Sequence, residues 1–163
     1  MEKIKKQINR WLIFFIVALI ISGFTAIPVE KELSFSLKMT EDYGTINHWL
    51  QKVYDGFQAM NQQYPFLAYG YDWLAFAHFV LAILFIGPLR DPVKNIWVIE
   101  FGMIACLLII PFALMAGYFR GIPFWWRLID CSFGIIGLLP LIIIHKKTGQ
   151  LKEFQTQTDV YED

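Results

Sequence analysis

The sequence has few of the residues and motifs on which common enzymes depend. It contains two cysteines, Cys106 and Cys131, in no C-x-x-C arrangement, which excludes the usual paired-cysteine redox and zinc motifs. No G-x-S-x-G, H-E-x-x-H or P-loop pattern occurs either, so the signatures of common hydrolases, metalloproteases and nucleotide-binding proteins are absent. The 14 basic residues are balanced by 14 acidic ones, and without a basic excess we expect no nucleic-acid partner.

Histidine is also scarce. The three histidines, His48, His78 and His145, are predicted to lie at three different levels of the protein. A bis-histidine haem requires two histidines at matching depth on facing helices. We therefore expect no haem, no metal site and no other cofactor.

What the sequence does contain is apolar residues, which make up 56% of its 163 positions. They form four long runs, at residues 11–27, 73–89, 95–117 and 124–145. A helix needs roughly 20 mainly apolar residues, and at least about 17, to cross the core of a bilayer. The runs therefore predict an all-α membrane protein, a four-helix transmembrane bundle.

The first run has an alternative interpretation. Its cationic start and apolar core resemble a secretory signal peptide. The end of the run lacks a clean A-x-A cleavage site, and three further runs follow. We interpret residues 11–27 as a retained first helix.

The distribution of lysine and arginine predicts the orientation, because positively charged loops stay in the cytoplasm. With the N-terminus inside, nine basic residues fall in cytoplasmic segments and five in external ones. This count favours an orientation with both termini in the cytoplasm. We expect the membrane to be a bacterial inner membrane.

Residues 28–72 form the one sizeable extramembrane piece of the prediction, an extracytoplasmic α+β insertion. From Leu33 to Met39 apolar and polar residues alternate, as in a half-buried strand. From Thr45 to Gln63 apolar residues recur every three or four positions, as in an amphipathic helix. We expect this helix to lie on the outer membrane surface, to cover the bundle or to bind a partner.

The rest of the chain completes the predicted domain organisation. Residues 1–147 are predicted to form a single transmembrane bundle that includes the insertion. Residues 148–163 are polar and end in acidic residues, so we predict a disordered cytoplasmic tail.

Ionisable side chains inside a bilayer are costly, about 2.5 kcal/mol or more for a central charge, so each one requires a reason. His78 and Asp130 are predicted at similar depth in the outer half of the bundle. Arg127 is one turn from Asp130, and Arg120 and Trp126 lie close by in the sequence. These five residues form the candidate ligand-binding site.

Three interpretations of this site remain open. In the first, Arg127 and Asp130 are a neutralised pair, and His78 donates to a backbone carbonyl of another helix. In the second, the arginines bind a lipid headgroup or a carboxylate. In the third, His78 and Asp130 relay protons or catalyse a reaction.

Glu100 lies near the inner end of the third run. There we expect a structural role, in which lysine or arginine side chains reach it from the membrane surface.

The function that this sequence favours is non-enzymatic. We expect a small integral membrane protein that binds a lipid, a small anion or a partner membrane protein in the outer half of the bundle. Its partners would be membrane lipids, with a partner membrane protein or a second copy of the chain as further candidates. The alternative is a membrane-embedded enzyme or proton-coupled carrier that uses His78 and Asp130.

Overall fold

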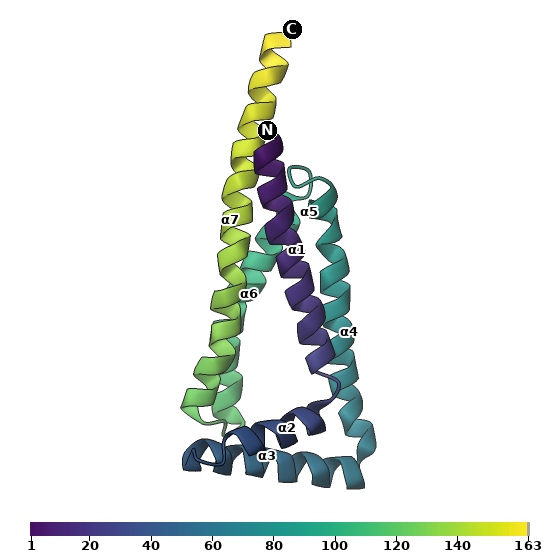
Figure 1. The fold of residues 1–163 in the computed structure, drawn as a ribbon, viewed down its shortest axis with the longest axis vertical. Helices are drawn as coiled ribbons and strands as arrows, with labels where there is room; N and C mark the ends of the chain where they lie inside the picture. The colour runs from purple at the N-terminus through teal and green to yellow at the C-terminus, as the bar shows by residue number, and fades with distance from the viewer. Residues whose placement is uncertain (163) are drawn as a thin grey trace. The chain divides into compact units, whose positions relative to one another are not determined.

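The computed structural model describes residues 1–162, with the side chains of residues 1–157. The described residues are helical, with no strand among them. The elements are α1 (Glu2–Thr25), α2 (Val29–Met39), α3 (Gly44–Gln63), η1 (Pro65–Ala68), α4 (Tyr69–Leu84), α5 (Ile86–Arg90), α6 (Ile96–Phe119) and α7 (Phe124–Glu162) (Figure 1).

The chain forms two compact units. Unit 1 consists of Met1–Val17 and Ala82–Asp163, and unit 2 consists of Ala18–Leu81. Unit 1 therefore contains α6 and α7, whereas unit 2 contains α2 and α3.

Four helical segments are long and apolar enough to cross a membrane: Glu2–Thr25, Pro65–Arg90, Ile96–Phe119 and Phe124–Gln157. They overlap all four predicted runs. The runs 73–89 and 124–145 lie wholly within them, whereas the first segment ends two residues before its run and the third begins one residue after the start of its run. This finding agrees with the predicted membrane helices and indicates an integral membrane protein with a helical bundle.

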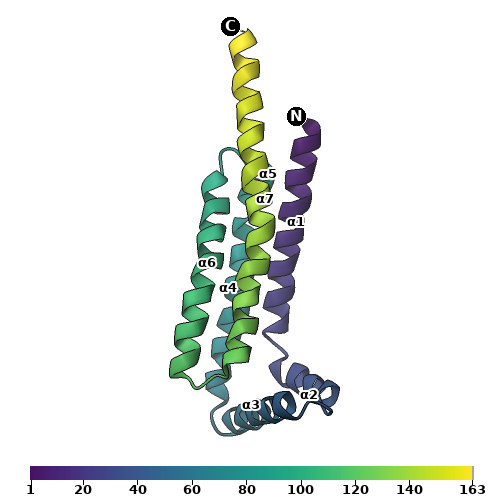
Figure 2. The same cartoon turned by 90° about the vertical axis from the view of Figure 1, so that its left-hand side faces the viewer.

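Helices α6 and α7 run side by side in unit 1 (Figures 1 and 2). Glycines allow this close approach. A Cβ on Gly134 would lie 2.5 Å from the carbonyl oxygen of Cys106, and one on Gly102 would lie 3.0 Å from Cδ1 of Leu141. Small residues at such contacts are typical of membrane helices, whose backbones pack closely.

The turn between α6 and α7 follows from one glycine. Gly121 has φ +67°, a left-handed conformation that glycine adopts without steric cost. The Ile122 N–H donates to the Gly117 carbonyl at 2.9 Å, and the Gly121 N–H donates to the Tyr118 carbonyl at 3.2 Å. These two bonds form a Schellman motif, which ends α6, and α7 begins three residues after Gly121, at Phe124.

The turn before α6 is organised by Asp91. Its carboxylate accepts hydrogen bonds from the backbone N–H groups of Val93 at 3.1 Å and Lys94 at 3.0 Å. The Lys94 backbone bond lowers the pKa of Asp91 below 3.8, with further help from the Lys94 charge and the Val93 bond, against a smaller opposing effect of burial. The regular helix begins five residues after Asp91, at Ile96.

The predicted disordered tail from residue 148 differs from the structure, in which α7 continues to Glu162. Thr148 and Leu151 are 0% and 1% exposed, and Lys147 donates to the Gln7 side chain of α1 at 2.7 Å. Polar composition predicts disorder only where nothing is buried. Here the spacing of Leu141, Ile144, Thr148 and Leu151 continues one buried face of the helix.

In unit 2 the predicted strand at residues 33–39 is wrong, because these residues belong to α2. Leu33 and Leu37 lie one helical turn apart and are half-buried, whereas Phe35 and Met39 are exposed. Alternation over seven residues also contains an i, i+4 pair, so it does not distinguish a strand from a short helix. Two glutamates in the first turn and Lys38 in the last suit the helix dipole.

Helix α3 matches the predicted helix at residues 45–63 within one residue. It packs beside α2 (Figure 2). The Asn47 amide donates to the Leu37 carbonyl at 3.0 Å and to the Thr40 hydroxyl at 3.3 Å, which ties the start of α3 to the end of α2.

Candidate functional site

Arg127 is the predicted site residue that connects α7 to α6. It extends from the first turns of α7 to α6, where its Nη1 donates to the Leu114 carbonyl at 3.3 Å. The guanidinium also lies 5.4 Å from the centre of the Phe124 ring, within the range of a cation–π contact. Its Nε is buried and has no hydrogen-bond partner among the described residues.

Gly117 makes room for this arginine. A Cβ on Gly117 would collide with the Cδ and Cγ of Arg127. The absent side chain therefore leaves a notch in α6 that holds the aliphatic stem of Arg127. This fixes the position of the guanidinium relative to both helices.

The predicted Arg127–Asp130 pair does not form. In the described part of the chain, Asp130 takes part in no ion pair and no side-chain hydrogen bond, although its side chain is half-buried. Spacing of three residues permits a salt bridge on a helix, but the Arg127 stem is directed into the Gly117 notch instead. Among the described residues, Arg127 therefore has no carboxylate partner and Asp130 has no cationic partner.

Arg120 and Trp126 flank Arg127 in the chain. Arg120 is the exposed residue at the end of α6, just before the Gly121 turn. Trp126 is half-buried in the first turn of α7, and its ring centre lies 5.5 Å from that of Trp125. Unit 1 therefore brings four of the five predicted site residues to the beginning of α7.

His78 belongs to unit 2, in α4. Its Nδ1 lies 2.8 Å from the Leu74 carbonyl oxygen. A carbonyl oxygen can only accept, so Nδ1 carries the hydrogen of this bond, and in the neutral imidazole Nε2 is then the acceptor. The sequence analysis allowed a hydrogen bond to a carbonyl of another helix, whereas this bond is made within α4, one turn back.

The structure also brings together two residues that the sequence analysis kept apart. His145 Nε2 of α7 lies 3.2 Å from Glu100 Oε1 of α6. A lysine or arginine was the expected partner of Glu100. Pairing the two helices in antiparallel order with equal depth would have revealed the contact, because both residues lie near the inner ends of their predicted spans.

No group of three or more metal-binding side chains occurs among the described residues. The candidate site residues offer charges, hydrogen-bond donors and hydrogen-bond acceptors. Arg127 supplies a cation with free donors, and Asp130 and His78 supply acceptors.

Comparison of the chain with protein-family models, with curated proteins and with solved structures gives no match.

Proposed function

We propose that this chain is a non-enzymatic integral membrane protein that binds an anionic group at Arg127, in the outer half of the membrane. The ligand class is a lipid headgroup, a small anion, or an acidic side chain of a partner membrane protein or second copy. The observation that carries the proposal is the guanidinium of Arg127, anchored between α6 and α7 without a carboxylate within ion-pair distance in the described residues.

An unpaired charge in a membrane helix is unfavourable, and an added anion would offset that cost. Arginine suits this role because its planar donors match carboxylate and phosphate oxygens in pairs. Nη1 is used by the Leu114 carbonyl, which leaves Nη2 and the partnerless Nε on the same edge of the guanidinium. Nε is buried, so Nη2 is the group that can donate to an anion.

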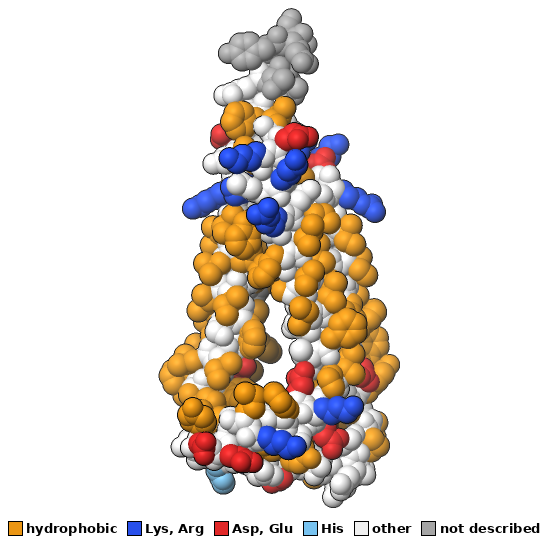
Figure 3. Space-filling view, viewed as in Figure 1, with side chains coloured by type: hydrophobic (Ala, Val, Ile, Leu, Met, Phe, Trp, Pro, Cys, Tyr) orange, Lys and Arg blue, Asp and Glu red, His pale blue; other side chains and the backbone are white. Residues whose placement is uncertain are grey.

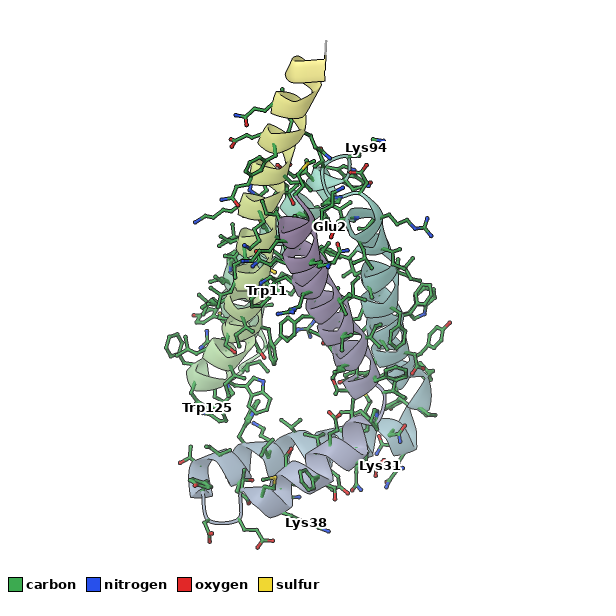
Figure 4. All side chains as sticks on the ribbon, turned by 45° about the horizontal axis from the view of Figure 1, so that its top comes forward. Glu2, Trp11, Lys31, Lys38, Lys94 and Trp125 are labelled. Atoms are coloured by element: carbon green, nitrogen blue, oxygen red, sulfur yellow. The ribbon has the colours of Figure 1, made fainter. Side chains whose placement is uncertain are left out.

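The proposed location is the bacterial inner membrane, with both termini in the cytoplasm. The basic residues support this orientation. In unit 1, lysines and arginines gather at the end that carries the N-terminus (Figure 3), and Glu2 and Lys94 are labelled at that end in Figure 4. Positive charge at one end of membrane helices is typical of the cytoplasmic side.

The test compares Arg127→Met with Arg90→Met in purified protein. Arg127→Met keeps much of the stem that fills the Gly117 notch but removes the charge. We expect wild type and Arg90→Met to retain an anionic phospholipid that native mass spectrometry detects, and Arg127→Met to lose it. Equal retention by all three proteins would contradict the proposal, provided that the helix content of each is unchanged by circular dichroism.

A small anion or an acidic protein partner would give a different result in the same samples. No lipid is then retained, and acetate or phosphate raises the unfolding temperature of wild type but not of Arg127→Met. If the ligand is an acidic side chain of a second copy of the chain, cross-linked dimers form with wild type but not with Arg127→Met.

A second candidate function is a proton-coupled carrier or membrane-embedded enzyme that uses His78 and Asp130. Two observations favour it: the Nε2 of His78 is left as a proton acceptor by the Leu74 bond, and the Asp130 carboxylate has no partner in the described residues. The test is proton flux into proteoliposomes under a pH gradient. This function requires the flux to fall in His78→Gln and in Asp130→Asn while Arg90→Met retains it, and absence of flux in wild type excludes the carrier.

A further inference from the structure

Unit 2 contains a groove of about 510 Å³ that has no part in the proposed Arg127 site. Its walls are formed by five residues of α2 and one of α3: Glu30, Lys31, Ser34, Phe35, Lys38 and Tyr54. The α2 residues recur at three- and four-residue spacing, so they share one face of that helix. The volume lies in the range of small-molecule binding sites.

Two wall residues are fixed by one amide. The Gln58 side chain donates to Tyr54 Oη at 2.8 Å and to Glu30 Oε1 at 3.3 Å. Because Tyr54 Oη accepts this bond, its own hydrogen remains available to a ligand. The Glu30 carboxylate is likewise held by an amide and not by a lysine.

The two lysines of the groove are available to bind a ligand. Neither Lys31 nor Lys38 forms an ion pair within the described part of the chain, and both extend from α2 (Figure 4). Two ammonium groups against one carboxylate make the groove positive. The hydroxyls of Ser34 and Tyr54 add two neutral donors beside this charge.

An apolar wall completes the groove. The Phe35 side chain is 63% exposed and lies between the two lysines in sequence. A ligand that combines oxygen acceptors with an apolar part can accept from the lysines and hydroxyls and pack against Phe35. A phosphate group offers several acceptor oxygens and a full negative charge, which matches several donors better than a carboxylate does.

We propose that this groove binds a phosphate ester that carries an apolar group. Lys31 and Lys38 contact the phosphate with Tyr54 and Ser34 as further donors, and Phe35 packs against the apolar part. The ester is either a phospholipid headgroup or a soluble phosphate ester. The lipid has the advantage of position, because α2 begins four residues after the candidate span that ends at Thr25.

The lipid source is tested with the full chain in phosphatidylcholine nanodiscs that contain a phosphatidylglycerol with a photoactivatable group near its glycerol. After illumination, mass spectrometry maps the adducts. We expect adducts on residues 29–39, and we expect their yield to fall about tenfold in the Lys31→Gln, Lys38→Gln double variant.

The soluble source is tested in discs of phosphatidylcholine alone, by adding phenyl phosphate, whose ring supplies the apolar group, and following the unfolding temperature. A saturable rise in wild type that the double variant lacks identifies a soluble ester. Either lysine-dependent result supports the groove. If neither the adducts nor the rise in unfolding temperature depends on the two lysines, the proposal is overturned.

Two further variants separate ligand binding from general charge and from misfolding. Lys31→Arg with Lys38→Arg keeps the charge and should retain binding. Lys146→Gln with Lys152→Gln removes equal charge from exposed positions of unit 1 and should leave the groove unaffected. Neither groove lysine has a partner in the described residues, so the Gln variants should show the helix content of wild type.

Discussion

Gly134 is the residue whose side chain the fold can least accommodate. It is buried on α7 against the backbone of α6, and an added Cβ would lie 2.5 Å from the Cys106 carbonyl oxygen and 3.3 Å from the Ile109 Cβ. A backbone atom cannot move aside as the end of a long side chain can. The α6–α7 contact therefore depends on this glycine.

We expect Gly134→Ala to destabilise the protein by about 1–3 kcal/mol, because it overpacks a helix contact. Gly149→Ala on the same helix is the control, since nothing lies within 4 Å of its added Cβ. There the gain in helix propensity should stabilise the protein by up to about 1 kcal/mol. Thermal unfolding in detergent measures both. The packing described for α6 and α7 would be wrong if the two substitutions had the same sign.

The contacts of Arg127 and Asp130 predict a difference in unfolding temperature between variants of these two residues. Arg127→Ala should lower the unfolding temperature more than Asp130→Asn. The arginine loses its stem packing at Gly117 and its bond to the Leu114 carbonyl, whereas the aspartate has no partner among the described residues. Asn also removes a charge from a candidate span while keeping a polar group of similar shape. Equal or reversed damage in melting curves would contradict this account of the two side chains.

Which residues the sequence could predict depends on how local their contacts are. Arg127 was predicted as a site candidate from its place in an apolar run. Its contact with Gly117 was not predictable, because an i, i+3 aspartate is the nearer partner in sequence. The Glu100–His145 contact joins residues 45 positions apart, and only the pairing of α6 with α7 brings them together.

At the scale of elements, the turn before α6 should respond to pH. Asp91 has a lowered pKa in the folded protein, so its contribution is fully present above the unfolded pKa near 3.8 and is lost as pH falls through the lower folded pKa. Removing such a cap costs typically about 1 kcal/mol. Asp91→Ala should therefore unfold at lower temperature than wild type at pH 7 and at pH 5.

This difference between Asp91→Ala and wild type should shrink as the pH is lowered below 3.8. The exposed Glu41 serves as control, because no hydrogen bond or ion pair is made by its side chain in the described residues. Glu41→Ala should match wild type at each pH. A gap for Asp91→Ala that persisted unchanged at the lowest pH would show that the Asp91 carboxylate does not act through its charge.

The length of α7 gives the next prediction. Leu151→Ala should destabilise the protein by about 2 kcal/mol or more, because Leu151 is 1% exposed and its truncation leaves a cavity. Lys152→Ala, one residue further along and exposed, should be nearly neutral. Chemical denaturation in a mild detergent compares the two. Equal effects would favour the disordered tail that composition alone predicts.

The elements differ in how far their sequence determines them. The long apolar runs and the 45–63 helix were predicted closely, since their periodicity extends over many residues. The α2 region was misassigned because a pattern of seven residues fits two periods. The end of α7 was missed because its buried positions, spaced three and four apart, are separated by polar residues that dominate the composition.

At the scale of the whole molecule, length and hydropathy determine the class of protein. Four segments of 24 to 34 residues are apolar enough to span a membrane, and their exposed apolar side chains would be unfavourable in water. Exposed phenylalanines such as Phe112, Phe119 and Phe133, each more than 60% exposed, are expected to face lipid. Length and hydropathy do not determine the proposed ligand or partners, because binding depends on a few polar side chains.

The most direct test of the four-span topology is cysteine labelling in intact cells with a membrane-impermeant maleimide. In a background with Cys106→Ala and Cys131→Ala, a single cysteine is introduced at Gln62 of α3 or at Lys152 of α7. We predict that Gln62→Cys is labelled in intact cells and that Lys152→Cys is labelled only after lysis. Labelling of Lys152→Cys in intact cells, or protection of Gln62→Cys until lysis, would contradict the topology on which the proposed function depends.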